Sequence, residues 1–180
     1  TTSEKNYFGV GFAKEDEQNT IPRPDVPAYF LLSPNGILLG DGFVEIPSLE
    51  NPANTARGRL FNVVEGTDAY FAVGCIDCFN SFTRGILIKI DKTTLAEQHW
   101  DDLLPNGYTS GRLNDIVHVS SGGENYLLVT GWADDGNGRK NWVAAYDYNG
   151  NLRSTGSVPH ELVTLSSGES GAMVHDIAPD

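Results

Sequence analysis

Positive charge, sulfur and long apolar runs are all scarce in this sequence. Its 180 residues include 12 lysines and arginines against 24 aspartates and glutamates, a formal net charge of −12. Nucleic acids and anionic membrane surfaces select basic proteins, so this balance argues against both as partners. No stretch of 18 apolar residues occurs, and we therefore expect no membrane span. The plainer interpretation of the acidity is that it serves solubility alone.

The sequence also lacks the usual marks of targeting. No signal peptide is visible, no Asn-x-Ser/Thr acceptor for N-glycosylation occurs, and the single methionine is Met173. Because the sequence begins at Thr1, we expect a mature chain, a proteolytic piece or a domain of a longer polypeptide.

Glycine and proline, in contrast, are plentiful and stand between short apolar runs. Twenty glycines and nine prolines in such places indicate turns rather than disorder. The clearest unit has apolar runs at 126–129 and 142–148, and the second run stops at Asn149-Gly150. Asn-Gly between apolar runs favours a hairpin, because both turn residues accept positive φ. A return strand follows at 151–156.

Two more segments of the chain resemble this unit. Tyr7, Tyr70 and Tyr126 each begin an apolar run, and each run is followed by a polar loop, a second run, a turn and a third run. The second runs are 28–32, 86–90 and 142–146, and the third runs are 37–44, 95–100 and 151–156. A fourth element precedes the tyrosine at 58–64 and 111–117, and a similar run lies at 171–177.

Repeats of four short strands are typical of β-propeller blades. We therefore predict an all-β fold built from β-propeller blades of four antiparallel strands, with three blades in this chain. The predicted units are a blade without its first strand at 1–50, a second blade at 51–104, a third at 105–160, and a loop with a first strand at 161–180. Residues 1–46 of this or another chain complete that last blade. The alternative is a different all-β domain in which the likeness of the segments is accidental.

Three blades are too few to close a propeller ring, which usually has about 4–8. We expect another protein chain to close it. That chain is either a second copy, which gives a six-bladed ring, or the rest of a longer polypeptide. In both cases the first strand at 171–177 has an edge that proteins rarely leave uncovered.

Two segments carry a resemblance to known propeller families. The run Tyr-Phe-Ala-Val-Gly at 70–74, with 85–100, resembles a kelch-type blade, in which an apolar strand ends in glycines and a later strand leads to a tryptophan. The run at 126–131, with 143–150, resembles the degenerate propeller repeats of large bacterial secreted and surface proteins.

The kelch pattern is broken where its second strand should end in Gly-Gly. Here the glycine is followed by a different residue in each copy: Phe12, Cys75 and Trp132. The bacterial resemblance is therefore favoured. It implies an extracellular or cell-surface scaffold or interaction platform, and only a minority of such proteins are enzymes.

Cys75 and Cys78 form the sharpest local motif, a Cys-x-x-Cys. A structural zinc site needs two more ligands of similar spacing, and no second such pair occurs. A redox pair of the thioredoxin type sits at a helix N-terminus, whereas this pair leaves a predicted strand. A disulfide in an oxidising compartment and two free thiols remain as the interpretations.

A loop at 133–138 gathers carboxylates and amides beside glycines. Asp134, Asp135 and Asn137 are candidate Ca²⁺ ligands, since Ca²⁺ takes about 6–8 oxygen atoms. The loop lacks the alternating acids and the distant glutamate of a helical calcium loop, and a solvated turn is the alternative. No other cofactor is expected.

The first strand of a propeller blade lines the central channel, so polar residues there converge from different blades. Aligning positions 63, 116 and 177 makes Asn62, Asp115 and Asp176 equivalent. The channel-lining candidates are Asn62, Asn114, Asp115, His175 and Asp176, with Arg59 and Arg112 at the rim. Such a ring can bind a cation or a polar ligand, and His175 is a candidate base or metal ligand, because imidazole side chains in general titrate near neutral pH. The alternative is that these groups hold only channel waters or the neighbouring backbone.

No nucleophile elbow, phosphate loop with lysine, or zinc-protease histidine pair occurs in the sequence. We therefore expect a non-enzymatic scaffold or binding module. The alternative is a polysaccharide-acting hydrolase or lyase with its site at the channel mouth, because paired carboxylates are defined by geometry and not by spacing.

Overall fold

The computed structural model describes residues 5–14, 25–48, 56–78, 81–101, 103–104, 107–121, 123–153 and 161–163. These residues form β-strands and turns and contain no helix, which confirms the predicted all-β class. Nothing in this part of the chain is a helix long and apolar enough to cross a membrane.

The strands form three antiparallel sheets in which every pair of neighbouring strands is consecutive in sequence. The first sheet contains β1 (Tyr7–Lys14), β2 (Asp25–Leu32) and β3 (Leu38–Phe43). The second contains β4 (Gly58–Glu65), β5 (Ala69–Ile76), β6 (Arg84–Asp91) and β7 (Glu97–Trp100). The third contains β8 (Ser110–Ser121), β9 (Glu124–Asp134), β10 (Arg139–Tyr146) and β11 (Glu161–Val163).

Most of these strands fall on the predicted apolar runs, and the hairpins turn at the predicted places. Gly36 and Gly150 have φ of 78° and 75°, and each N–H donates to the carbonyl three residues before it. Asn35 and Asn149 do not have positive φ, so the expected positive φ at both residues of the Asn-Gly turn is wrong, and each glycine is the fourth residue of its turn. The third sheet departs from the prediction at its outer edge. Within the described part of the predicted run at 151–156, which is 151–153, Leu152 forms an isolated bridge to Tyr146, and β11 supplies the outer strand beyond position 160.

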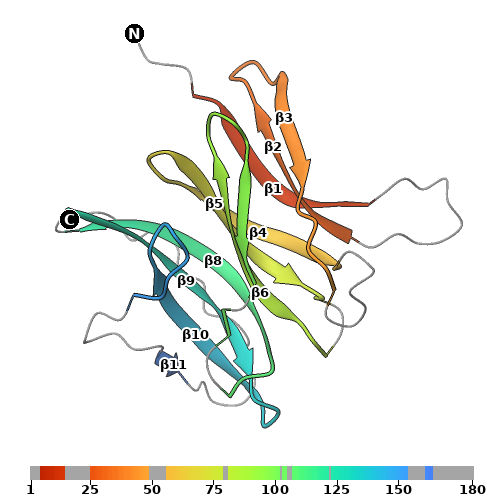
Figure 1. Ribbon diagram of the computed structural model, residues 1–180, viewed down its shortest axis with the longest axis vertical. Coiled ribbons are helices and arrows are strands. Elements are labelled where there is room, and N and C mark those ends of the chain that lie inside the picture. Colours follow the sequence, from red (N-terminus) through yellow and green to blue (C-terminus); the bar gives the residue numbers. More distant parts are fainter. Residues whose placement is uncertain are drawn as a thin grey trace, which may run out of the picture.

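The second sheet lies between the other two and is buried on both faces (Figure 1). On one face Ala72, Ile86 and Ile88 pack against the first sheet. On the other, Phe71 and Leu87 pack against the third sheet. Successive strand residues point to opposite faces, so a strand buried on both sides must be apolar throughout, as β5 and β6 are.

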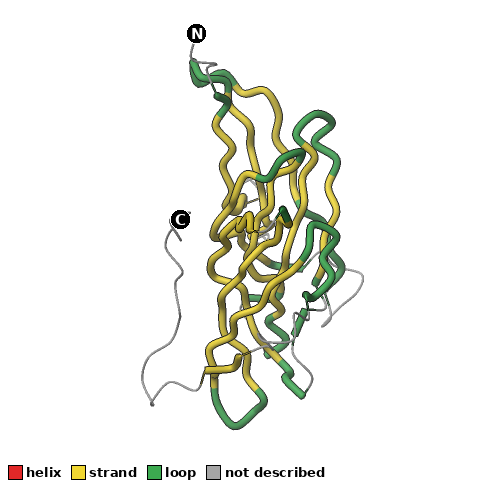
Figure 2. The backbone as a smooth tube through the Cα atoms, turned by 90° about the vertical axis from the view of Figure 1, so that its left-hand side faces the viewer, coloured by secondary structure: helices red, strands yellow, loops and turns green. Residues whose placement is uncertain are grey.

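Most strands run roughly along the long axis of the molecule (Figure 2). We call the face that each sheet turns toward the next sheet in chain order its front, and the opposite face its back. Phe8 and Tyr29 lie on the front of the first sheet, against the second. Trp142 and Tyr146 lie on the back of the third sheet, against the second. In the described residues, no sheet closes on itself.

The same irregularity occurs where β4 pairs with β5 and where β8 pairs with β9. Each first strand skips one residue of the ladder, between Leu60 and Asn62 and between Leu113 and Asp115. Leu60 lies opposite Gly74, and Leu113 lies opposite Gly131. These two glycines are therefore at equivalent positions, and each faces a β-bulge.

The glycines correct one detail of the sequence alignment. With Gly74 and Gly131 matched, Tyr70 corresponds to Leu127, because Tyr70 pairs with Ile90 and Leu127 pairs with the equivalent Tyr146. The alignment of Tyr70 with Tyr126 was wrong by one position, because the third copy has an additional residue between its tyrosine and its glycine.

We expect Gly74→Ala and Gly131→Ala to destabilise the fold by about 3 kcal/mol each. A Cβ at either position would lie 1.9 Å from a backbone carbonyl oxygen, that of Arg59 or Arg112, so the strand itself would have to move. Denaturant unfolding measures the loss. The equivalent residue of β1, Gly11, has open space around a Cβ, and a cost as large for Gly11→Ala in the isolated chain would contradict this explanation.

Candidate functional site

The bulges bring two of the predicted channel residues together. Asn62 of β4 donates a hydrogen bond from Nδ2 to Oδ1 of Asp115 on β8. Asp115 Oδ1 also accepts the backbone N–H of Ile116 at 2.9 Å, and the side chain is 5% exposed. The polar groups of the two first strands therefore satisfy each other across the sheet interface, which is what a buried carboxylate requires.

The other channel candidates do not join this pair. Asn114 occupies the skipped position of the β8 bulge and is half-buried. His175 and Asp176 lie outside the described residues. In the described part of the chain, this contact contains one carboxylate, that of Asp115, whereas glycosidase chemistry uses a pair of carboxylates.

Arg59, predicted at the rim, forms an ion pair with Asp25 of β2. Its Nε and Nη2 both donate to Asp25 Oδ2, at 2.9 and 2.5 Å. The guanidinium also lies 4.2 Å from the centre of the Phe12 ring. A cation held between a carboxylate and an aromatic face is stabilised by both. The charge of Arg59 is therefore already paired within the protein.

Arg112 is the equivalent residue of β8, and its surroundings differ. Its guanidinium lies 5.3 Å from the centre of the Phe61 ring, which belongs to the bulge of β4 and is not equivalent to Phe12 of β1. Its Nε is buried without a hydrogen-bond partner, and no carboxylate of the described residues pairs with it. Burial, with a smaller contribution from the Arg139 guanidinium, lowers the pKa of Arg112.

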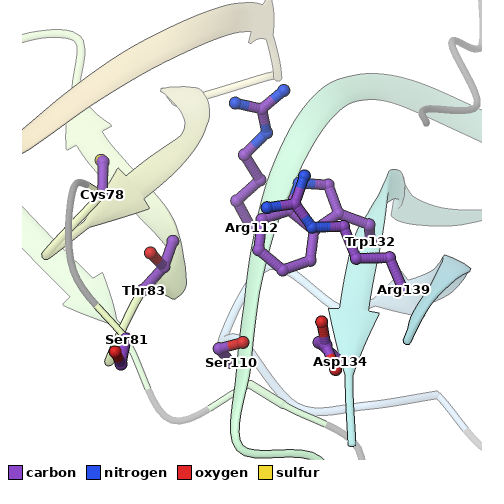
Figure 3. Close-up of a pocket in the computed structure, with 8 residues that line it drawn as sticks. All are labelled: Cys78, Ser81, Thr83, Ser110, Arg112, Trp132, Asp134 and Arg139. Carbon is purple, nitrogen blue, oxygen red and sulfur yellow. The ribbon is translucent and has the colours of Figure 1, made fainter. Parts of the chain in front are cut away.

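Arg112 lines a pocket of about 380 Å³ between the second and third sheets. Figure 3 shows Cys78, Ser81 and Thr83 on one side of the pocket, and the residues of β8, β9 and β10 on the other. Trp132 and Arg139 belong to the second group, and the Arg139 guanidinium lies 4.2 Å from the centre of the Trp132 ring.

The polar lining of this pocket has hydroxyl groups and more positive than negative charge. Ser81, Thr83 and Ser110 supply the hydroxyls. Asp134 is the single carboxylate of the lining, and its Oδ1 accepts the backbone N–H of Gly136 at 2.8 Å. Figure 3 shows it at the opposite end from the Arg112 guanidinium. The pocket therefore has an electropositive end, at which an anion is the complementary ligand.

Cys75 and Cys78 form a disulfide beside the pocket, with 5.5 Å between their Cα atoms. The four-residue loop that they close holds Asp77 at a φ of 52° and buries it to 3% exposure. Ser48 donates to Asp77 Oδ1 at 2.9 Å, and Arg84 lies 3.6 Å from Oδ2. The loop is thus fixed by a covalent bond and by a buried carboxylate.

The predicted calcium ligands make contacts within their own loop. Asp135 accepts the Asn137 N–H at 2.9 Å and the Lys140 ammonium at 3.1 Å, and these two groups, in that order, lower the pKa of Asp135. In the described part of the chain, no group of three or more His, Cys, Asp or Glu residues could hold a metal ion. The calcium site stays a prediction.

Sequence analysis missed the pocket residues Thr83, Trp132 and Arg139. The signal that finds two of them is the glycine register. Ala28, Ile86 and Trp142 pair with the three equivalent glycines, and three residues before them stand Asp25, Thr83 and Arg139.

Comparison with known proteins adds no relative, since no family model, curated protein or solved structure matches the chain.

We expect Asp77→Ala to destabilise the protein by about 2–3 kcal/mol, the magnitude of losing hydrogen bonds to a buried charge. Asp77→Asn should be milder, because asparagine also tolerates positive φ and keeps an acceptor for Ser48. Thermal or denaturant unfolding of both variants gives the comparison. Equal losses would mean that the charge facing Arg84 is the important feature, and not the loop geometry.

Proposed function

We propose that this protein is a non-enzymatic scaffold or binding module built from β-propeller blades, and that a second copy of the chain completes the ring. The observation that carries the proposal is an uncovered apolar face on the back of the first sheet. Phe30 and Phe43 lie there, 42% and 53% exposed. Exposed aromatic groups on a sheet face are typical of a protein interface.

Equivalent positions in the other sheets support this assignment. Phe30 of β2 corresponds to Ile88 of β6 and Ala144 of β10, because all three lie two residues after the residue that faces the glycine. Ile88 is fully buried and Ala144 is 3% exposed, each against the preceding sheet. The first sheet thus has the apolar residue of an interface, but the described residues of one chain form no preceding sheet.

The front of the third sheet is the complementary surface. Leu128 and Val143 are half-buried there, whereas their equivalents in the second sheet, Phe71 and Leu87, are fully buried. When the front of the third sheet in one copy packs on the back of the first sheet in another, both faces are covered. Two such contacts unite two chains into a ring of six sheets, within the range of known propellers.

The edge of β1 fits the same proposal. β5 and β9, the strands equivalent to β1, each pair with a strand on both sides, and one of these partners is β4 or β8. In the described residues β1 pairs on one side only, with β2. An unpaired edge is a template for another strand. The run at 171–177 resembles 58–64 in sequence, and we propose that it is the strand that pairs with β1.

A secreted or cell-surface location belongs to the proposal as well. The Cys75–Cys78 disulfide supports it, since disulfides persist in oxidising compartments. The polysaccharide-acting enzyme relies on His175 and Asp176, outside the described residues, and no observed contact favours it.

The first test is the mass of the purified chain by light scattering, with twice the 19.5 kDa of one chain as the expected result. Phe30→Asp should give the monomer, because it places a charge in the proposed interface. Ile37→Asp is the matched control, since Ile37 is exposed at a hairpin turn and should leave the dimer intact. A monomeric wild-type chain would contradict closure by a second copy.

Gly11→Ala tests the pairing of β1 separately. Its Cβ meets nothing within 4 Å in one chain, but at the equivalent Gly74 and Gly131 a Cβ would collide with the paired strand. We therefore expect Gly11→Ala to weaken the dimer about tenfold or more, as overpacking does. Ala13→Val is the control, because the equivalent residue of β5, Ile76, is already large. A dimer unaffected by Gly11→Ala would rule out a bulged partner strand.

A further inference from the structure

The two sheet interfaces share a backbone arrangement and differ in one partner of an ion pair. At the first interface Arg59 reaches back to β2 and meets the Asp25 carboxylate. At the second, Arg112 occupies the equivalent position, and the position equivalent to Asp25 is Thr83. The arginine is thus kept in the second interface while the residue that should neutralise it has no charge.

The space beside Thr83 is open. Thr83 and Arg112 line the same pocket of about 380 Å³, which is roomy enough for a small organic molecule. Thr83 itself is directed to the protein, since its hydroxyl donates to the carbonyl of Asp77 at 3.1 Å. At the first interface the Asp25 side chain occupies the place beside the arginine. At the second interface the corresponding place is part of the pocket, which a ligand can enter.

The electrostatics of the pocket agree with this substitution. Arg112 is half-buried, and its buried Nε has no hydrogen-bond partner; a buried donor is costly unless it is paired. Arg139 adds a second positive charge to the pocket, and its guanidinium lies over the Trp132 ring. Ser81 and Ser110 offer hydroxyls at the same pocket.

We propose that this pocket binds a carboxylate group, which takes the place at Arg112 that Asp25 takes at Arg59. Arginine recognises carboxylates through several N–H donors, and Arg59 shows this within the same chain, since its Nε and Nη2 both donate to Asp25 Oδ2. The carboxylate belongs either to a free organic acid or to an acidic side chain of a peptide. The pocket lies within one chain, so the proposal is independent of how chains assemble.

The test is a titration of ¹⁵N-labelled protein with sodium succinate at constant ionic strength, followed by the Arg112 Nε–H and Trp132 indole signals. A second arm uses the peptide acetyl-Gly-Asp-Gly-amide. Saturable shifts with succinate assign the site to free acids, and shifts with the peptide alone assign it to acidic side chains. Shifts with neither probe would overturn the proposal.

Four variants make the assignment specific. Arg112→Gln should weaken binding about tenfold or more, the value of a charge-assisted hydrogen bond. Arg59→Gln, the matched control, should leave it unchanged. Thr83→Asp should fill the site with an internal carboxylate and abolish binding, whereas Asp25→Thr should create a second site that depends on Arg59.

The exchange between positions 25 and 83 keeps the test decisive if one variant folds poorly. Thr83→Asp gives up the hydrogen bond to Asp77, but Asp25→Thr alters only the first interface and reports on the same recognition. Binding that persists in Arg112→Gln, or that survives Thr83→Asp in a folded protein, would show that succinate binds elsewhere and would overturn the proposal.

Discussion

The close approach of two backbones at Gly74, and again at Gly131, is the constraint on which the rest of the structure depends. At each place the carbonyl of an arginine on the first strand occupies the space that a side chain would need. The strand then skips one residue before it resumes pairing. A bulge of this kind redirects the side chains around it. Asn62 and Asp115, just after the two bulges, therefore meet across the interface, while Arg59, just before the first bulge, reaches the preceding sheet.

Burial on both faces determines the composition and the register of the second sheet. A sheet between two others has no polar face, so its strands read as continuous apolar runs and its register is fixed by what packs on each side. Phe71 and Ile88 illustrate this, since both are fully buried on opposite faces. The first sheet has the same kind of residue at Phe30 but exposes it. The contrast lies in what covers the two sheets and not in their own composition.

The sequence was sufficient for the strands and insufficient for their register. Apolar runs bounded by glycine, proline and Asn-Gly turns locate β5, β6, β9 and β10, because strand length and turn chemistry are local properties. A run of apolar residues does not state which of its members faces a neighbour, and so Tyr126 was matched where Leu127 belongs. The glycine opposite the bulge fixes that register. The outer strand of the third sheet was predicted at 151–156 and not at β11, because a three-residue strand has no period to detect. The pocket was missed because Asp25 and Thr83 become comparable only after the register is known.

Arg112 and Arg59 occupy equivalent positions at the two sheet interfaces but differ in whether a carboxylate meets them. An arginine at a sheet interface is useful to folding when a carboxylate meets it, as Asp25 meets Arg59. Without an acceptor, the buried Nε of Arg112 opposes folding, because the hydrogen bond that it makes with water is not replaced. Phe61 compensates for part of this through its ring, but a ring offers no acceptor to the buried Nε. Local rules are most often broken at functional sites, and here the broken rule leaves both an unsatisfied donor and an open volume beside it. Those two features together are what a binding site requires and what a purely structural position would lack.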